Sequence, residues 1–427
     1  MSSSLRNVRA LALALGALWV AGCTYALVSG NSVNQSRAER VVAGIQEIRE
    51  LNFKHPVPIV VETRDQAEKS MEADLERDFT DAQLHADGVA GSMLGLFPRG
   101  FDLKSESLKL AKSQVAGYYD PHRKQMALVE GTVDIGFWDK AAEFLVQRDL
   151  VGEMLLAHEL THALQDQNFG LEQMLDNVKN DDDRGTALKS VAEGDATIAG
   201  LAYVLGQMNQ ATLDRILAGS AQLPQLFATQ TASIPEGLSE PLIFQYDQGM
   251  RFVAEAYRRG GWDAVDRLYR DPPLSSQQII DPRMYFDHRV DPLDVSLEGY
   301  QPMLKDWRVV DEDTYGELLL SLILKINLGK DAPAVALAKK WSGDHMVILS
   351  HGEEIAVLWL IAFEGEDSAS AFAGAYRGIL SGQPGPSQVE ARKSAVLVVA
   401  GAPARDFAAL APLIWKSSSI APLHHET

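Results

Sequence analysis

The sequence predicts an α+β fold built in two parts. Up to about residue 298, long stretches carry apolar residues at helical spacing, and short runs rich in β-branched residues lie between them. Beyond residue 300, short apolar runs indicate strands, and segments 368–380 and 404–415 have the spacing of helices that cover a small sheet. Hydrophobic residues make up 46% of the chain and charged residues 23%, which is ordinary for a packed globular protein. We therefore expect one domain at 39–298 and a second α+β domain at 299–427.

Residues 1–22 have the organisation of an export signal. Arg6 and Arg9 precede an uncharged apolar run of about 12 residues, too short for a membrane-spanning helix of about 20. The run ends in Val20-Ala21-Gly22-Cys23, which resembles the lipobox of bacterial lipoproteins, and Cys23 is the only cysteine of the chain. The resemblance implies a lipid on Cys23 and, because Thr24 follows, an outer-membrane location facing the periplasm. An ordinary signal peptide with an incidental cysteine is the alternative.

The charge of the chain restricts its partners. The formal net charge is −19, and removal of residues 1–22 takes away two arginines and no acid, which leaves −21. Such an acidic protein is a poor partner for nucleic acid or for an anionic membrane surface. No later stretch is long and apolar enough to span a bilayer. We therefore expect attachment to the membrane through the lipid alone, with residues 23–38 as a tether.

The helices and strands of the first domain follow in a regular order. Predicted helices are 39–51, 64–78, 81–96 and 141–167, and predicted strands are 57–62, 114–119 and 125–129. Asp120-Pro121-His122-Arg123-Lys124 has turn chemistry, so the last two strands form a hairpin. An exposed hairpin edge just before a catalytic helix can bind an extended peptide by strand addition.

The helix at 141–167 carries His158-Glu159-Leu160-Thr161-His162. Residues four apart project from one helix face, so His158 and His162 can bind one zinc ion, and Glu159 can reach a water beside it. Apolar neighbours at helical spacing would bury the rest of this helix. Two histidines that merely satisfy each other on a core helix are the alternative.

A third ligand is expected on a second helix, from about residue 181 to 208. Glu193 lies 31 residues after His162 and has small same-face neighbours, which would let two helices and a metal approach closely. Asp195 is the rival ligand, but it lies about 200° around the helix from Glu193. A solvated surface glutamate is the remaining alternative.

With these residues the chain resembles the gluzincins, zinc metallopeptidases with two histidines from His-Glu-x-x-His and a downstream glutamate. The resemblance implies a zincin-like core in residues 114–208, Zn²⁺ on His158, His162 and Glu193, and Glu159 as general base for peptide hydrolysis. The protein or peptide substrate is not specified by the sequence. Thermolysin has an acid where this chain has Thr197, which leaves Thr197 or Asp166 to hydrogen-bond a zinc histidine.

The group that stabilises the oxyanion is less clear from the sequence. The turn-rich segment 272–285 resembles uncharacterised bacterial proteins that share the zinc motif, with Asp281 where a histidine is expected. Tyr285 is the first candidate, and Arg283, Tyr118 and Tyr119 are the others. A zinc-peptidase-like scaffold that binds envelope proteins without cleavage, and an amidase acting on cell-wall peptides, are the alternative functions.

Overall fold

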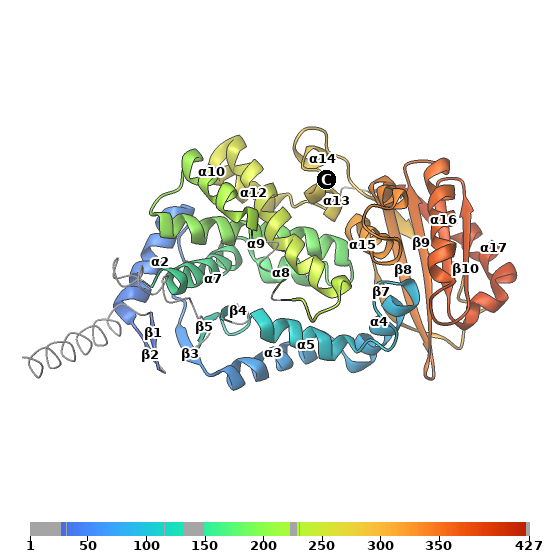
Figure 1. The fold of residues 1–427 in the computed structure, drawn as a ribbon, viewed down its shortest axis with the longest axis horizontal. Helices are drawn as coiled ribbons and strands as arrows, with labels where there is room; N and C mark the ends of the chain where they lie inside the picture. Colours follow the sequence, from blue (N-terminus) through green and yellow to red (C-terminus); the bar gives the residue numbers. More distant parts are fainter. Residues whose placement is uncertain are drawn as a thin grey trace, which may run out of the picture. The chain divides into compact units, whose positions relative to one another are not determined.

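The computed structural model describes residues 27–423, apart from residues 31, 115, 131–148, 223–228 and 230 (Figure 1). The fold is α+β, as the sequence predicts: helices are interspersed with small sheets of two, three and five strands. The predicted signal peptide, Cys23 and the first part of the predicted tether lie outside the described residues. In the described part of the chain, no helix combines the length and the apolar composition needed to cross a bilayer.

The chain forms two compact units. The first takes residues 1–70, 114–171 and 195–219, and the second takes residues 71–113, 172–194 and 220–427. This division differs from the predicted boundary at 298/299. One reason is local: β6 (Leu293–Ser296) pairs with β12 (Ser419–Pro422), which joins the residues before 299 to the C-terminal part of the chain.

The first unit begins with a hairpin, where the sequence predicted a tether. Strands β1 (Val28–Ser29) and β2 (Ser32–Val33) pair, and helix α2 (Gln35–Arg49) starts four residues earlier than expected. The Asn34 side chain caps α2 by accepting the backbone N–H of Arg37. Leu27 is buried and its N–H donates to Asp149 at 2.9 Å. The described part of the predicted tether is therefore folded.

The first unit contains a three-stranded sheet with the order β3-β5-β4. β4 (Gly117–Asp120) and β5 (Gln125–Val129) form the predicted antiparallel hairpin, and β3 (Ile59–Glu62) pairs with β5 in parallel. β4 is thus an edge strand, and it contacts helix α7.

Helix α7 (Leu150–Phe169) carries the histidine motif. Asp149 caps its first turn by accepting the N–H of Gly152, and Gly170, with a left-handed φ of 73°, ends it. Leu156, Leu160 and Leu164 are fully buried. The predicted start at residue 141 falls outside the described residues.

Helix α9 (Asp182–Leu205) follows after α8 (Leu171–Asp176) and carries Glu193. Its acidic first turn suits the positive end of the helix dipole. Gly200 lets α9 approach α7, because a Cβ there would lie 3.1 Å from the Met154 carbonyl oxygen and 3.3 Å from the His158 Cβ. The unit boundary falls inside this continuous helix, between residues 194 and 195. α10 (Gln210–Gly219) completes the first unit.

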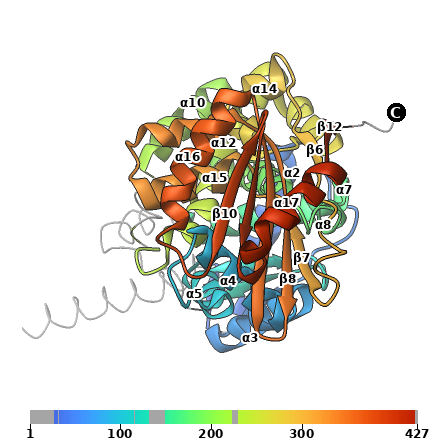
Figure 2. The ribbon, with the colours of Figure 1, turned by 90° about the vertical axis from the view of Figure 1, so that its right-hand side faces the viewer.

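The second unit contains a five-stranded antiparallel sheet of order β10-β11-β9-β8-β7 (Figure 2). Its strands are β7 (Arg308–Asp313), β8 (Trp341–His351), β9 (Glu354–Phe363), β10 (Ser387–Arg392) and β11 (Ala395–Ala400). Helix α17 (Phe407–Ser417) packs Leu410 and Ile414 on the face that carries Leu358 and Leu360. Helix α16 (Glu366–Leu380) packs Phe372 against Phe363, on the opposite face.

The remaining helices include the predicted α3 (Arg64–Asp78) and α4 (Asp81–Leu94), and the unpredicted α5 (Leu103–Gln114). Others are α12 (Glu236–Arg270), α13 (Ser276–Ile280), α14 (Arg283–Phe286) and α15 (Gly316–Leu328). The backbone of α12 is non-helical at Gly260 and Gly261.

Candidate metal centre

His158 and His162 lie one turn apart on the half-buried face of α7. Their Nε2 atoms are 3.2 Å apart, and their rings meet edge to face at 87° with centroids 4.9 Å apart. Two imidazole nitrogens bound to one tetrahedral zinc at about 2.0–2.1 Å would be about 3.3 Å apart. The distance between the histidine nitrogens therefore fits a shared zinc ion.

Glu193 supplies a carboxylate oxygen to the same cluster. One ligand atom from each of His158, His162 and Glu193 can be chosen so that all three lie within 4.8 Å of one another. Glu193 lies in the middle of helix α9. The donor set of two nitrogens and one oxygen is that of a catalytic zinc site, in which a fourth position is left for water.

Asp195, the rival ligand, has a different environment. Its Oδ1 accepts Arg49 Nε at 2.8 Å, and its Oδ2 accepts Gln165 Nε2 at 3.1 Å. The side chains of Arg49 and Asp195 are fully buried. Gln165 in turn places its Oε1 2.9 Å from His162 Nδ1. Sequence reasoning missed Arg49 and Gln165, although both are polar residues at buried positions of helical patterns.

Glu159 faces the edge strand β4. The backbone N–H of Tyr119 donates to a carboxylate oxygen of Glu159 at 3.1 Å. This N–H points away from the neighbouring strand β5, toward α7. This hydrogen bond fixes one carboxylate oxygen of Glu159, the predicted general base.

The two tyrosines of β4 both donate to carboxylates. Tyr119 Oη donates to Asp166 at 3.0 Å, and Lys124 Nζ donates to the same Asp166 oxygen at 2.7 Å. Tyr118 Oη donates to Glu62 at 2.7 Å, and burial raises the pKa of Tyr118. Asp166, a predicted partner of a zinc histidine, is thus occupied by Tyr119 and Lys124.

Thr197 was the other predicted partner of a zinc histidine. Its Oγ1 is buried and forms no hydrogen bond within the described part of the chain. Gln165, three residues after His162, makes the imidazole contact that the sequence analysis assigned to Thr197 or Asp166.

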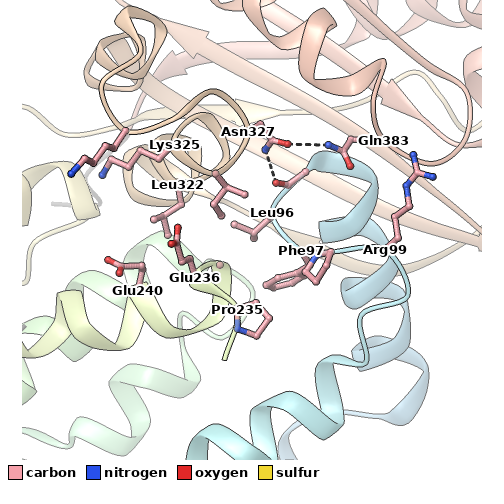
Figure 3. Close-up of a pocket in the computed structure, with 15 residues that line it drawn as sticks. Leu96, Phe97, Arg99, Pro235, Glu236, Glu240, Leu322, Lys325, Asn327 and Gln383 are labelled. Carbon is pink, nitrogen blue, oxygen red and sulfur yellow. Dashed lines mark hydrogen bonds between the residues drawn. The ribbon is translucent and has the colours of Figure 1, made fainter. Parts of the chain in front are cut away.

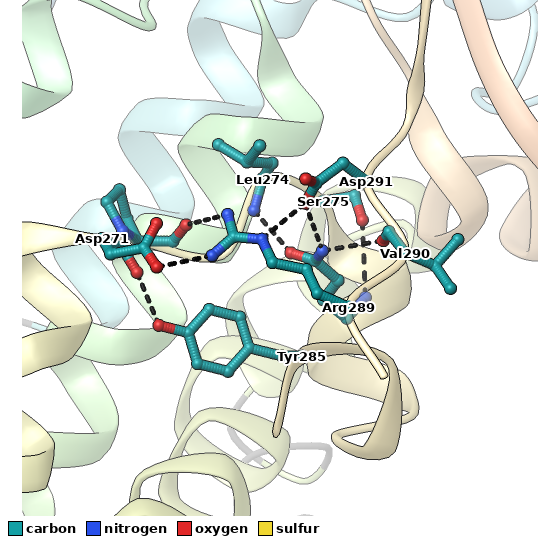
Figure 4. A network of polar contacts seen from close by, with 9 residues as sticks. Asp271, Leu274, Ser275, Tyr285, Arg289, Val290 and Asp291 are labelled. Carbon is teal, nitrogen blue, oxygen red and sulfur yellow. Dashed lines mark hydrogen bonds and ion pairs between the residues drawn. The ribbon is translucent and has the colours of Figure 1, made fainter. Parts of the chain in front are cut away.

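Tyr285, the first candidate for the oxyanion, belongs to the second unit (Figure 4). Its hydroxyl donates to the Asp271 carbonyl at 2.5 Å, and Arg289 lies over its ring, 5.2 Å from the centroid. Burial is the main cause that raises the pKa of Tyr285 to about 12. These contacts are typical of a packing tyrosine, so its catalytic role stays a prediction.

Asp281 and Arg283, in the same segment, form an exposed ion pair. Arg283 donates to both carboxylate oxygens of Asp281, at 2.8 and 2.6 Å. These hydrogen bonds lower the pKa of Asp281, so this carboxylate stays ionised and cannot stabilise an oxyanion.

An open cavity of about 960 Å³ lies in the second unit (Figure 3). Residues 95–99, the start of α12 and the end of α15 line it, and Asn327 bridges Gly95 and Gln383 by hydrogen bonds of 2.7 and 3.0 Å. The described residues that line it include both acidic and basic side chains, and none of these described residues is a histidine, cysteine or serine.

Residues 305–411 match the model of a domain of unknown function, DUF8575. This range begins just before β7 and ends within α17, so the histidine motif and Glu193 lie outside it. No curated protein and no solved structure matches the chain.

Proposed function

We propose that the protein is a zinc-dependent metallopeptidase with His158, His162 and Glu193 as ligands. The observation that carries the proposal is the 3.2 Å separation of the two histidine Nε2 atoms, with a Glu193 oxygen in the same cluster. Glu159 lies next to His158 on the same helix, where a general base for hydrolysis is needed. The lipobox-like sequence at Cys23 adds a lipid anchor at the cell envelope to this proposal.

The metal ligands, Glu159 and Tyr119 have different roles in the proposed hydrolysis. Zinc bound here would supply Lewis-acid chemistry, because it polarises carbonyls and makes water acidic enough to ionise near about pH 7. The Glu159 carboxylate takes the proton of the attacking water, holds it, and passes it to the nitrogen of the departing amine. The Tyr119 N–H orients this carboxylate by binding one of its oxygens.

The edge strand β4 supports a peptide as substrate. Among the described residues it pairs with β5 alone, and its Tyr119 N–H points to the other side, where it donates to Glu159. An extended peptide chain can add to such an edge by main-chain hydrogen bonds, which recognise the backbone and not a particular side chain. Tyr118 and Tyr119 are the candidates nearest to such a chain for stabilising an oxyanion.

Zinc content tests the assignment of the three ligands. Purified full-length protein should contain one zinc per chain, and His158→Ala and Glu193→Ala should lose most of it. His85→Ala, at an exposed position of α4, is the matched control and should keep its zinc. Wild-type protein without stoichiometric zinc, or equal zinc in all three variants, would overturn the assignment of ligands.

Hydrolysis is tested separately on an unstructured protein substrate. Activity should disappear with a chelator and return when zinc is added. Stoichiometric zinc without any cleavage of proteins or cell-wall peptides would favour the catalytically silent scaffold.

A further inference from the structure

Four polar side chains connect three helices of the first unit to the proposed metal centre. Arg49 at the end of α2 bonds Asp195 on α9, Asp195 bonds Gln165 on α7, and Gln165 bonds His162. Arg49, Asp195 and Gln165 are each completely buried. Water therefore has no direct access to the carboxylate or the amide, and each group must bond to its protein neighbours.

The donors and acceptors of these groups permit one direction only. A guanidinium only donates and an ionised carboxylate only accepts, so Asp195 must receive a hydrogen bond from Gln165 as well as from Arg49. Gln165 therefore turns its NH₂ group to Asp195 and its carbonyl oxygen to His162. The His162 Nδ1 must then carry the proton, and its Nε2 has the lone pair, which faces His158 Nε2 at 3.2 Å.

We propose that Arg49, Asp195 and Gln165 are positioning residues that fix the tautomer of His162. They select the Nδ1–H form and direct Nε2 toward the metal. This inference rests on the proposed function, since it gives the selected lone pair a zinc ion to bind. Groups that orient zinc-bound histidines in this way typically change metal affinity by about 10- to 100-fold.

The buried ion pair is not explained by stability alone. A buried Arg–Asp pair is often replaceable by apolar side chains without loss of stability, because removing two charges from water is costly. The Asp195 oxygen that does not face Arg49 is directed at Gln165, and through it at the histidine. The Arg49–Asp195 pair thus fixes which group donates and which accepts in the hydrogen bonds that lead to His162, and an apolar contact would not do so.

Asp195→Asn tests the direction of these hydrogen bonds, because asparagine has nearly the same shape as aspartate but carries an NH₂ group that donates. Arg49 still requires an acceptor, so the introduced asparagine should turn its oxygen to Arg49 and its NH₂ group to Gln165. The Gln165 amide should then turn over and donate to His162 Nδ1. The proton should move to Nε2, the atom that binds the metal.

Two measurements on the full-length protein follow this change. Nitrogen NMR of the zinc-free protein at about pH 8, where imidazole is neutral, should show His162 as the Nδ1–H tautomer in wild type and the Nε2–H tautomer in Asp195→Asn. Competition with a chromophoric chelator should show zinc affinity reduced about 10- to 100-fold. An unchanged tautomer together with unchanged zinc affinity would overturn the proposal.

Asp344→Asn is the matched control. Asp344 is a buried carboxylate of the second unit that accepts N–H groups from Trp341, Trp359, Tyr315 and Gly316. Its substitution should lower stability but leave the His162 tautomer and zinc affinity as in wild type. Should Asp195→Asn not fold, Gln165→Met replaces it, with a mixture of tautomers and weaker zinc binding expected. If wild-type protein binds no zinc, the proposed function fails, and the NMR result alone decides on the tautomer.

Discussion

Gly194 and Gly249 meet so closely that a Cβ on Gly194 would lie 2.3 Å from the Gly249 carbonyl oxygen. The approach is mutual, because a Cβ on Gly249 would lie 2.1 Å from the Ser190 carbonyl oxygen. Helices α9 and α12 therefore touch backbone to backbone directly beside Glu193. Further along α9, Gly200 packs in a similar way against His158. The position of the proposed ligand Glu193 thus depends on Gly194 and Gly249, at which any side chain would separate the two helices.

Gly194→Ala should destabilise the protein and weaken zinc binding. The added methyl group meets rigid backbone, so we expect an overpacking cost of about 1–3 kcal/mol in the free energy of unfolding, measured by chemical denaturation. Gly185→Ala, on the same helix, is the control. A Cβ there meets only one atom, at 3.9 Å, and alanine favours the helix by up to about 1 kcal/mol. Equal stability of the two variants would contradict the close packing of α9 on α12.

Glu159→Gln should abolish hydrolysis and leave zinc bound. Glutamine can still accept the Tyr119 N–H, but it cannot take a proton from water, a function worth about 10²–10⁴-fold in rate. Turnover and zinc content are measured on the same preparation. Glu153→Gln, on the same helix, removes the partner of Arg37 and should cost stability but retain turnover. Undiminished cleavage by Glu159→Gln would place the chemistry elsewhere.

Asp87→Asn should stabilise the protein at high pH. Burial, and then repulsion by Asp311 and Asp182, raises the pKa of Asp87 to about 8. Between about pH 4 and pH 8 the folded state therefore binds more protons than the unfolded state, so this group lowers stability as the pH rises. Above about pH 8 the variant should exceed wild type by on the order of 2 kcal/mol, and below about pH 4 the two should converge.

Thermal unfolding across this pH range measures the effect of Asp87. Its Oδ1 has no hydrogen-bond partner within the described residues, so asparagine breaks no known contact of that oxygen. Asp263→Asn, at an exposed position of α12, is the control and should show no comparable gain. A constant difference between Asp87→Asn and wild type at all pH values would contradict the raised pKa.

Cys23→Ser should release the protein from the membrane. If Cys23 carries the lipid, wild-type protein should fractionate with the outer membrane and partition into detergent. The variant should remain unprocessed or appear as soluble periplasmic protein. One acyl chain alone holds a protein only marginally, so stable anchoring requires the several chains of a lipoprotein. Unchanged membrane association of Cys23→Ser would instead indicate a protein partner.

Local patterns predicted some elements within a few residues of their observed limits. The limits of α3 and the β4–β5 hairpin agree with the structure, because each follows from spacing or turn chemistry within a few residues. The parallel pairing of β3 with β5 could not be predicted, since it joins segments more than 60 residues apart. Helix α5 was missed because none of its described residues is buried, so it lacks a clear apolar face.

In the candidate site too, local spacing could be predicted from the sequence and contacts between distant segments could not. His158 and His162 follow from a four-residue spacing, whereas the contact of Arg49 with Asp195 joins residues 146 apart in the chain. A signal for Arg49 was nevertheless present. Val41, Ile45 and Arg49 are spaced by four and all are buried, so the arginine occupies a core position of α2. A cation at such a position requires a buried anion, which the sequence could have prompted us to seek.

Arg49 also sets a lower limit on the length of a working fragment. A fragment that starts after α2 would keep the histidine motif, Glu193 and both strands of the hairpin. It would nevertheless leave the Asp195 carboxylate buried without its cation, a situation that typically costs about 3–5 kcal/mol. Helix α2 is thus part of the smallest unit that can be excised, crystallised or transplanted with the proposed metal site intact.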